Sequence, residues 1–177
     1  MSAFGVASAD ALREAFDRTF AVAPRALEDP RESVLLVQVG GDPYSIRLAQ
    51  IAALFVGKRV MWVPSPVREL RGVMSVRGAI LPVYDLAELL GYPKTTVSRR
   101  WLVTVAAAPV ALAFDRFDGH GQIAPGAVSP SPSGQTHAPH VREIVHLDAV
   151  VRPLIDIPSV VETIARLASP PARRSIE

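Results

Sequence analysis

The spacing of hydrophobic residues changes along the chain near Pro30. Before it, apolar residues recur at helical spacing from about Asp10 to Ala21, with charged residues opposite them. This predicts an amphipathic helix in an extension over residues 1–30 that either packs on its own domain or docks on a partner. After Pro30 the period falls to about two, which is typical of strands.

The strand-like segments are short and are separated by glycine and proline turns, a pattern that favours small β-barrels. Asp85 is placed to cap a helix that Gly91 ends. Because proline cannot donate a ladder hydrogen bond, we expect Pro82 and Pro153 at strand edges or bulges. The predicted strands are Val34–Val39, Tyr44–Leu48, Val60–Val63, Leu70–Val76 and Ala79–Tyr84, with a helical turn over Ala49–Phe55 and a helix over Leu86–Leu90.

The second half of the chain repeats the first. Leu70–Leu90 lies without a gap on Val141–Val161 at a shift of 71 residues, so that Asp85 falls on Asp156. We therefore expect one domain over residues 31–168 with two similar barrels, at about 33–93 and 100–157, and the Leu86–Leu90 helix near their junction. A loop over residues 129–139, a C-terminal helix after Pro158 and a frayed tail over residues 169–177 complete the prediction. Val160, Val161, Ile164 and Leu167 share one face of that helix.

Composition narrows the classes of function. The chain has 177 residues, 49% of them hydrophobic, a net charge of +2 and no cysteine, which indicates a packed core without disulfides or thiolate metal sites. The arginines are scattered rather than gathered on one face, so nucleic-acid binding is only a minor alternative. We expect no membrane insertion, because apolar runs such as Val103–Leu112 are short. Residues 1–30 lack the apolar core of a secretory signal, and we expect a cytoplasmic protein.

Reactive residues do not gather into a catalytic pattern. His137 and His140 have a spacing that some metal sites use, but no third ligand is fixed nearby. Asp115 and Asp118 are interpreted as part of a turn at a strand end rather than an acid–base pair. No phosphate-binding loop or nucleophile elbow is present. We therefore expect a binding or scaffold protein with no catalytic residue, no metal and no cofactor.

One motif points to a known family. Residues 70–86 read Leu-Arg-Gly-Val-Met-Ser-Val-Arg-Gly-Ala-Ile-Leu-Pro-Val-Tyr-Asp-Leu, in which the order Arg-Gly, then Pro, then Asp-Leu is fairly specific. Over about residues 33–165 the chain resembles the CheW-like domain of bacterial chemosensory systems. The resemblance implies two linked SH3-like five-stranded barrels without enzymatic activity, in a mainly β fold with short helices.

The resemblance also implies partners. Members of this family couple chemoreceptors to the regulatory domain of the histidine kinase CheA, and contacts between such domains, including other CheW-like domains, build rings. The receptor tip lies in an apolar groove between the barrels. The matching positions here are Leu48, Ile51 and Leu54, with Arg77 and Gly78 in the loop that the family keeps. We expect the three apolar residues, with Phe55, on a short helix, where they either line the groove or fill the core.

The chain departs from the family pattern in three places. Ala53 stands where the connecting helix usually carries a Glu that pairs with the Arg of the Arg-Gly loop, Ser75 replaces an Asn, and Glu143 replaces a Gly. Arg77 therefore lacks its expected acid. An alternative function follows, that of a divergent CheW-like protein in an accessory signalling system with a different partner.

Overall fold

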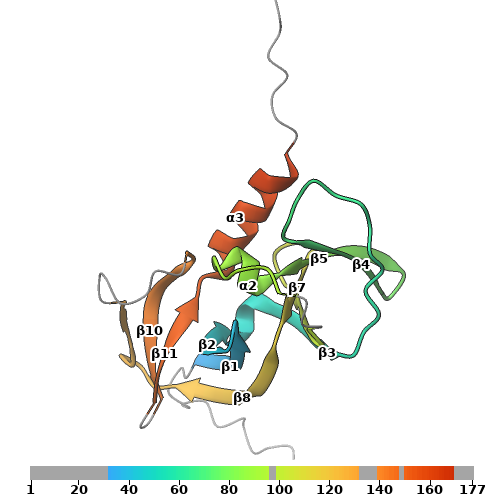
Figure 1. The fold of residues 1–177 in the computed structure, drawn as a ribbon. Coiled ribbons are helices and arrows are strands. Elements are labelled where there is room, and N and C mark those ends of the chain that lie inside the picture. The colour runs from blue at the N-terminus through green and yellow to red at the C-terminus, as the bar shows by residue number, and fades with distance from the viewer. Residues whose placement is uncertain (1–31, 96–98, 132–138, 148–149, 170–177) are drawn as a thin grey trace, which may run out of the picture. The chain divides into compact units, whose positions relative to one another are not determined.

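A computed structural model describes residues 32–95, 99–131, 139–147 and 150–169 (Figure 1). The predicted helix of residues 1–30, most of the predicted loop and the tail beyond Ser169 lie outside these residues. The described strands are β1 (Glu32–Val39), β2 (Asp42–Arg47), β3 (Ile51–Val56), β4 (Leu70–Val76), β5 (Ala79–Asp85), β6 (Trp101–Val105), β7 (Ala111–Phe114), β8 (Arg116–Ile123), β9 (Val128–Pro130), β10 (Val141–Leu147) and β11 (Val150–Ile155). The helices are η1 (Leu48–Gln50, a 3-10 turn), α2 (Leu86–Leu89) and α3 (Ile157–Ala168).

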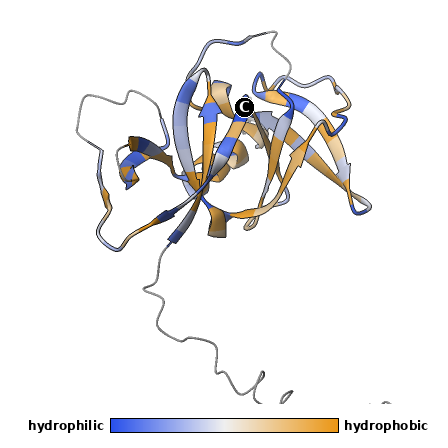
Figure 2. Cartoon of the chain, turned by 90° about the horizontal axis from the view of Figure 1, so that it is seen from below, coloured by the Kyte–Doolittle hydropathy of each residue, from blue (hydrophilic) through white to orange (hydrophobic). Residues whose placement is uncertain are grey.

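The strands form two sheets, which confirms the prediction of a mainly β, two-part fold. One sheet has the order β8-β1-β2-β11-β10-β9, and the other has the order β3-β6-β7-β5-β4. Figure 2 shows apolar and polar residues together along these strands, as expected where each strand has one face toward a core. One sheet has the expected five strands, and the short strand β9 gives the other a sixth.

The two sheets do not coincide with the two halves of the sequence. The β1–β2 hairpin of the first half takes β8 and β11 of the second as its neighbours, and the β6–β7 hairpin takes β3 and β5 of the first. The predicted barrel boundaries, 33–93 and 100–157, are therefore wrong as a description of the sheets. Turn residues specify which strands form a hairpin, but they do not specify which strand joins the edge of that hairpin.

The internal repeat itself is confirmed. Strand β5 runs parallel to β7, with Val83 opposite Ala111, and β11 runs parallel to β2, with Leu154 opposite Ser45. A helix follows each of these strands. The Asp85 carboxylate accepts hydrogen bonds from the N–H groups of Ala87 and Glu88 at the start of α2, and Asp156 accepts one from Ser159 in α3.

Both prolines lie where a ladder bond is not required. Pro82 is opposite Val73 on β4, but the pairing of β5 with β7 begins only at Val83. Pro153 is opposite Ile144 on β10, and the pairing of β11 with β2 begins only at Leu154. Each proline is thus at the open end of a ladder on one side, as predicted, although neither is at a bulge.

Two local predictions are wrong. Residues 51–56 form strand β3, and only Leu48–Gln50 make a helical turn, because β3 pairs with β6 of the second half. The apolar composition of this segment suits a strand as well as a helix, and the partner strand decides between them. The predicted strand Val60–Val63 is reduced to one bridge between Met61 and Val73.

Both sheets and both helices contribute to one main core. Its buried residues include Val37 and Ile46 from one sheet, Leu112 from the other, and Leu86 from α2, so α2 lies at the junction of the sheets as predicted. The apolar face of α3 is confirmed for its inner residues, since Val160 and Ile164 are buried and Val161 is partly buried in this core. Leu167 is 38% exposed and does not share that burial.

Candidate partner-binding surfaces

The three apolar residues predicted to bind a partner have unequal exposure. Leu48 lies in η1 and is 41% exposed. Ile51 and Leu54 lie in β3, where they are partly buried and pack against the main core. The expectation that these residues share a helix face is wrong, because β3 is a strand and its side chains alternate between two faces. Of the three, only Leu48 is exposed.

Arg77 and Gly78 form the exposed tip of the β4–β5 hairpin. Their φ angles are 48° and 84°, the positive pair that a two-residue type I′ turn requires. Strands β3 and β4 lie at opposite ends of the strand order of their sheet. No hydrogen bond or ion pair among the described residues joins this turn to Leu48, Ile51 or Leu54. The predicted surface residues therefore come from three elements, namely η1, β3 and the β4–β5 turn.

A buried charge network lies between the two sheets. The Arg99 side chain, 1% exposed, donates from Nε to Asp85 at 2.8 Å and also pairs with Asp115. Arg71 reaches the same Asp85 oxygen at 2.7 Å. Asp115 in turn accepts a hydrogen bond from the N–H of Gly41 in the β1–β2 turn at 3.2 Å. The network therefore links a turn of one sheet to a strand end of the other, and it contains two acids and two bases.

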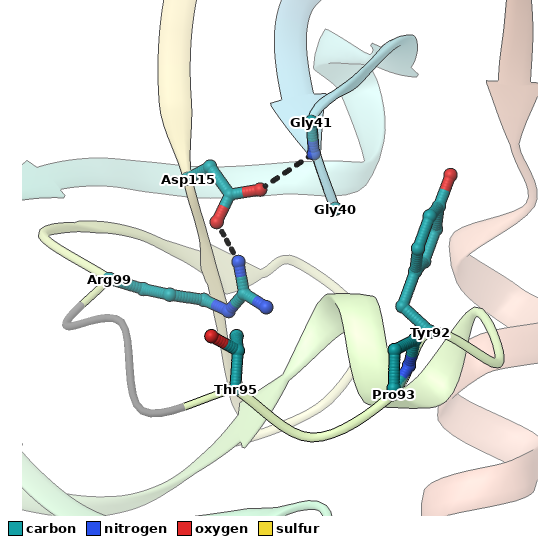
Figure 3. A pocket seen from close by; sticks show the side chains of 7 residues that line it. All are labelled: Gly40, Gly41, Tyr92, Pro93, Thr95, Arg99 and Asp115. Atoms are coloured by element: carbon teal, nitrogen blue, oxygen red, sulfur yellow. Dashed lines mark hydrogen bonds and ion pairs between the residues drawn. The ribbon is translucent and has the colours of Figure 1, made fainter.

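A cavity of about 410 Å³ opens beside this network (Figure 3). Gly40, Tyr92 and Pro93 line it together with Arg99 and Asp115. Burial raises the pKa of the Tyr92 phenol, and hydrogen bonds to Asp42 and Tyr44 raise it further. The phenol therefore stays protonated, and the Arg99 charge is already balanced by carboxylates. The described lining has no free nucleophile, base or charge with which to act on a substrate.

A second exposed region was not predicted from the sequence. Met61, Trp62 and Ile80 are 59%, 75% and 73% exposed, which is unusual for large apolar side chains. Met61 and Ile80 line a hollow of about 340 Å³, together with Lys58 and Ser75. A Trp beside a proline-rich bend was the available sequence signal for this region. It could not predict exposure, because exposure depends on which strands cover the segment.

The histidines do not form a metal site in the described residues, where no cluster of three or more potential ligands is present. His140 instead lies 2.8 Å from the Ser159 hydroxyl through its Nδ1, and His137 lies outside the described residues. Asp118 pairs with Arg116 and Arg152 on β8 and β11. No helix in the described part of the chain is long and apolar enough to span a membrane.

Comparison with known proteins identifies a family and a fold. A family model for the CheW-like domain matches residues 33–165. Among solved structures, the chain is similar to the crystal structure of the scaffolding protein TtCheW from Thermoanaerobacter tengcongensis, with 19% identity and a TM-score of 0.63. That likeness covers 71% of this chain and 88% of the other. No curated protein matches the chain.

Proposed function

This chain belongs to the CheW-like domain family, a family of chemotaxis scaffold and adaptor proteins, and we propose that it couples chemoreceptors to a CheA-type histidine kinase in the cytoplasm. The observation that carries the proposal is the family match over residues 33–165, which includes strands of both sheets. The same match confirms the resemblance inferred from the motif at residues 70–86. The proposal includes no catalysis and no cofactor.

Leu48 supports a receptor-binding surface at η1. Its side chain is 41% exposed, and Ile51, three residues further along the chain, packs against the main core. An apolar residue fixed on a packed base suits a helical receptor tip, because apolar contact is the main source of affinity for a helix laid in a groove. The kinase regulatory domain and, in a ring, other CheW-like domains are the further proposed partners. For these partners we propose the β4–β5 hairpin of this chain, with Arg77 and Gly78 at its tip.

Substitution by glutamate separates binding from packing. Leu48→Glu is expected to change the free energy of unfolding by no more than about 0.5 kcal/mol, as is usual for surface positions, while weakening binding of a receptor cytoplasmic fragment at least about tenfold. Leu54→Glu is expected to cost about 2–5 kcal/mol of unfolding free energy, because it places a charge against the core. Urea unfolding and calorimetric titration measure the two effects.

Val56→Glu is the matched control, since Val56 is 56% exposed in the same β3 segment. It is expected to leave both stability and receptor binding close to those of the parent chain. Unchanged receptor affinity in Leu48→Glu would contradict the proposed surface. A stable Leu54→Glu that has lost binding would move the surface from η1 to β3.

A specific observation favours a second candidate, an adaptor for an accessory signalling system. Ala53 in β3 stands where the family usually has Glu, and Arg77 has no ion pair among the described residues. Loss of an acid at this position of β3 changes the charge that a partner meets, which is a simple way to alter the choice of partner. Titration with the regulatory domain of each CheA-type kinase of the organism distinguishes the two candidates, since tighter binding to an accessory kinase supports the second.

A further inference from the structure

The outer edge of β4 is only partly used by this chain. β4 is the last strand of its sheet, and on its outer side Val73 exchanges two backbone hydrogen bonds of 2.8 Å with Met61. Ser75 is two residues further along β4, opposite Ile80 on β5. Backbone groups two residues apart in a strand point to the same side. The N–H and C=O of Ser75 therefore face outward beyond the bridge, where no described segment pairs with them.

Gly72 allows the backbone at Met61 to approach β4 closely. A Cβ atom at Gly72 would lie 2.1 Å from the Met61 carbonyl oxygen, and the φ of Gly72 is 143°. The backbone at Met61 and Trp62 therefore lies against β4 at Gly72. Its pairing with the outer side of β4 is limited to the single bridge between Met61 and Val73. The edge is left open on the side toward the Arg77–Gly78 turn.

Apolar side chains and a hollow border the open edge. The hollow of about 340 Å³ is lined by Met61, Val73, Ser75 and Ile80, among others, and its volume is within the usual range of ligand pockets. Met61 and Ile80 are more than half exposed. An open strand edge beside exposed apolar side chains suits an extended peptide, whose backbone continues the ladder while alternate side chains enter the hollow.

The charge of the lining identifies the chemistry of that peptide. Among the described residues, the ionisable ones of the lining are Lys58 and Arg59, both positive, and none of them is an acid. Arg77 adds a third positive residue at the hairpin tip. Complementary charge gives orientation and specificity to a contact of this kind.

We propose that the β4 edge binds an extended acidic segment of a partner chain, which adds as a strand beside Ser75, with acidic side chains toward Lys58 and Arg59 and apolar ones against Met61 and Ile80. This inference does not rest on receptor binding, because it uses β4 rather than η1 and β3. It shares only Arg77 with the hairpin proposed for the kinase and ring partners. A receptor helix has no free backbone groups to pair with Ser75, so the occupant is not the receptor tip.

The test uses a phage-displayed library of random ten-residue peptides selected on the full chain. The enriched peptides are expected to alternate Asp or Glu with apolar residues. The most enriched peptide is then synthesised, and its Kd is measured by fluorescence anisotropy. The double variant Lys58→Glu/Arg59→Glu and the single variant Ile80→Ser are each expected to weaken binding at least tenfold. Val151→Ser is the matched control, because Val151 is 51% exposed at the equivalent position of the β10–β11 hairpin, and its Kd is expected to be unchanged.

Hydrogen exchange reports the strand addition itself. The Ser75 amide is expected to exchange at least tenfold more slowly when the peptide is bound. Enriched peptides without acidic residues, or an exchange rate of Ser75 that the peptide does not change, would overturn the proposal. Self-association of the parent chain that Ile80→Ser abolishes would also overturn it, because the occupant of the edge would then be a second copy.

Discussion

Asp85 has two tasks at one position. Its carboxylate caps α2 by accepting hydrogen bonds from the N–H groups of Ala87 and Glu88. It also accepts hydrogen bonds from the side chains of Arg71 and Arg99. A fully buried carboxylate is costly unless several donors surround it, and these four donors satisfy that condition. The helix cap was evident from the sequence, whereas the two arginines come from β4 and from the segment before β6.

Removal of Arg99 is expected to be one of the more damaging single changes. Arg99→Met takes a charged partner from Asp85, which has no exposed surface, and from Asp115, and the expected cost is about 3–5 kcal/mol of unfolding free energy. Urea unfolding measures it. Arg116→Met is the control, since Arg116 is 61% exposed in its pair with Asp118 and is expected to cost less than about 1 kcal/mol. Equal effects of the two variants would show that the buried network has no special role in stability.

The residue scale also explains a departure from the family pattern. Gly72 and Glu143 occupy equivalent positions in the repeat, each beside a register shift in its strand. At Gly72 the crossing of Met61 leaves no room for a Cβ atom. Glu143 instead reaches Arg47 at 2.8 Å. In β10 the equivalent position therefore carries a side chain that forms an ion pair.

At the scale of elements, the start of α3 is bonded to His140, the residue immediately before β10. The backbone C=O of His140 accepts a hydrogen bond from Asp156 N–H at 2.8 Å, and its imidazole contacts Ser159 in the first turn of the helix. The φ of His140 is 68°, in the left-handed region. Burial lowers the pKa of His140 and nearby Arg166 and Arg142 lower it further, while Asp156 opposes them.

This lowered pKa predicts a pH dependence of stability. Below the ordinary histidine pKa of 6.5, the unfolded chain binds a proton at this position that the folded chain resists. The contribution is therefore fully present above that pH and is lost as the pH falls toward the folded pKa of His140. His140→Asn keeps a residue that tolerates positive φ and removes the titration. Its unfolding free energy is expected to change less between pH 7 and about pH 5.5 than that of the parent chain.

Urea unfolding at a series of pH values measures the difference. His146→Asn is the control, because His146 is exposed on β10 and bonds Ser129 rather than a helix end. As an exposed substitution, it is expected to leave the unfolding free energy at pH 7 within about 0.5 kcal/mol of that of the parent chain. A parent-like profile in His140→Asn would show that another group causes the dependence.

At the scale of the whole domain, the two halves are interleaved. Each sheet combines strands from before and after α2, and the main core contains residues from both halves. Unlike two barrels in sequence, such an arrangement gives neither half a complete sheet or a closed core. Folding therefore depends on contacts that are distant in sequence.

Separated halves are accordingly expected not to fold. Fragments covering residues 31–95 and 99–177 should each lack a cooperative unfolding transition, because each has unpaired strand edges and half of a core. Circular dichroism with urea unfolding tests each fragment alone and in an equimolar mixture. The mixture is expected to regain β-structure if the halves complement each other. A cooperative transition in either fragment alone would contradict the interleaved architecture.

The sequence by itself determined the features that depend on near neighbours. The period of two located the hairpin strands β4 and β5, the Arg77–Gly78 turn joined them, and Asp85 and Asp156 marked the helix starts. The internal shift of 71 residues identified equivalent strands, and the motif at residues 70–86 identified the family. These signals are local because backbone φ preferences, caps and alternation act over a few residues.

The tertiary structure decided the pairings between distant segments. Residues 51–56 became a strand only because β6 pairs with them, and the same exchange of strands replaced the predicted barrel boundaries. It also buried Arg99 and left Trp62 and Ile80 exposed. Exposure and burial of a side chain depend on which distant segment covers it. Hydrophobic burial is non-directional, so the apolar pattern alone does not predict which distant segment will cover a given side chain.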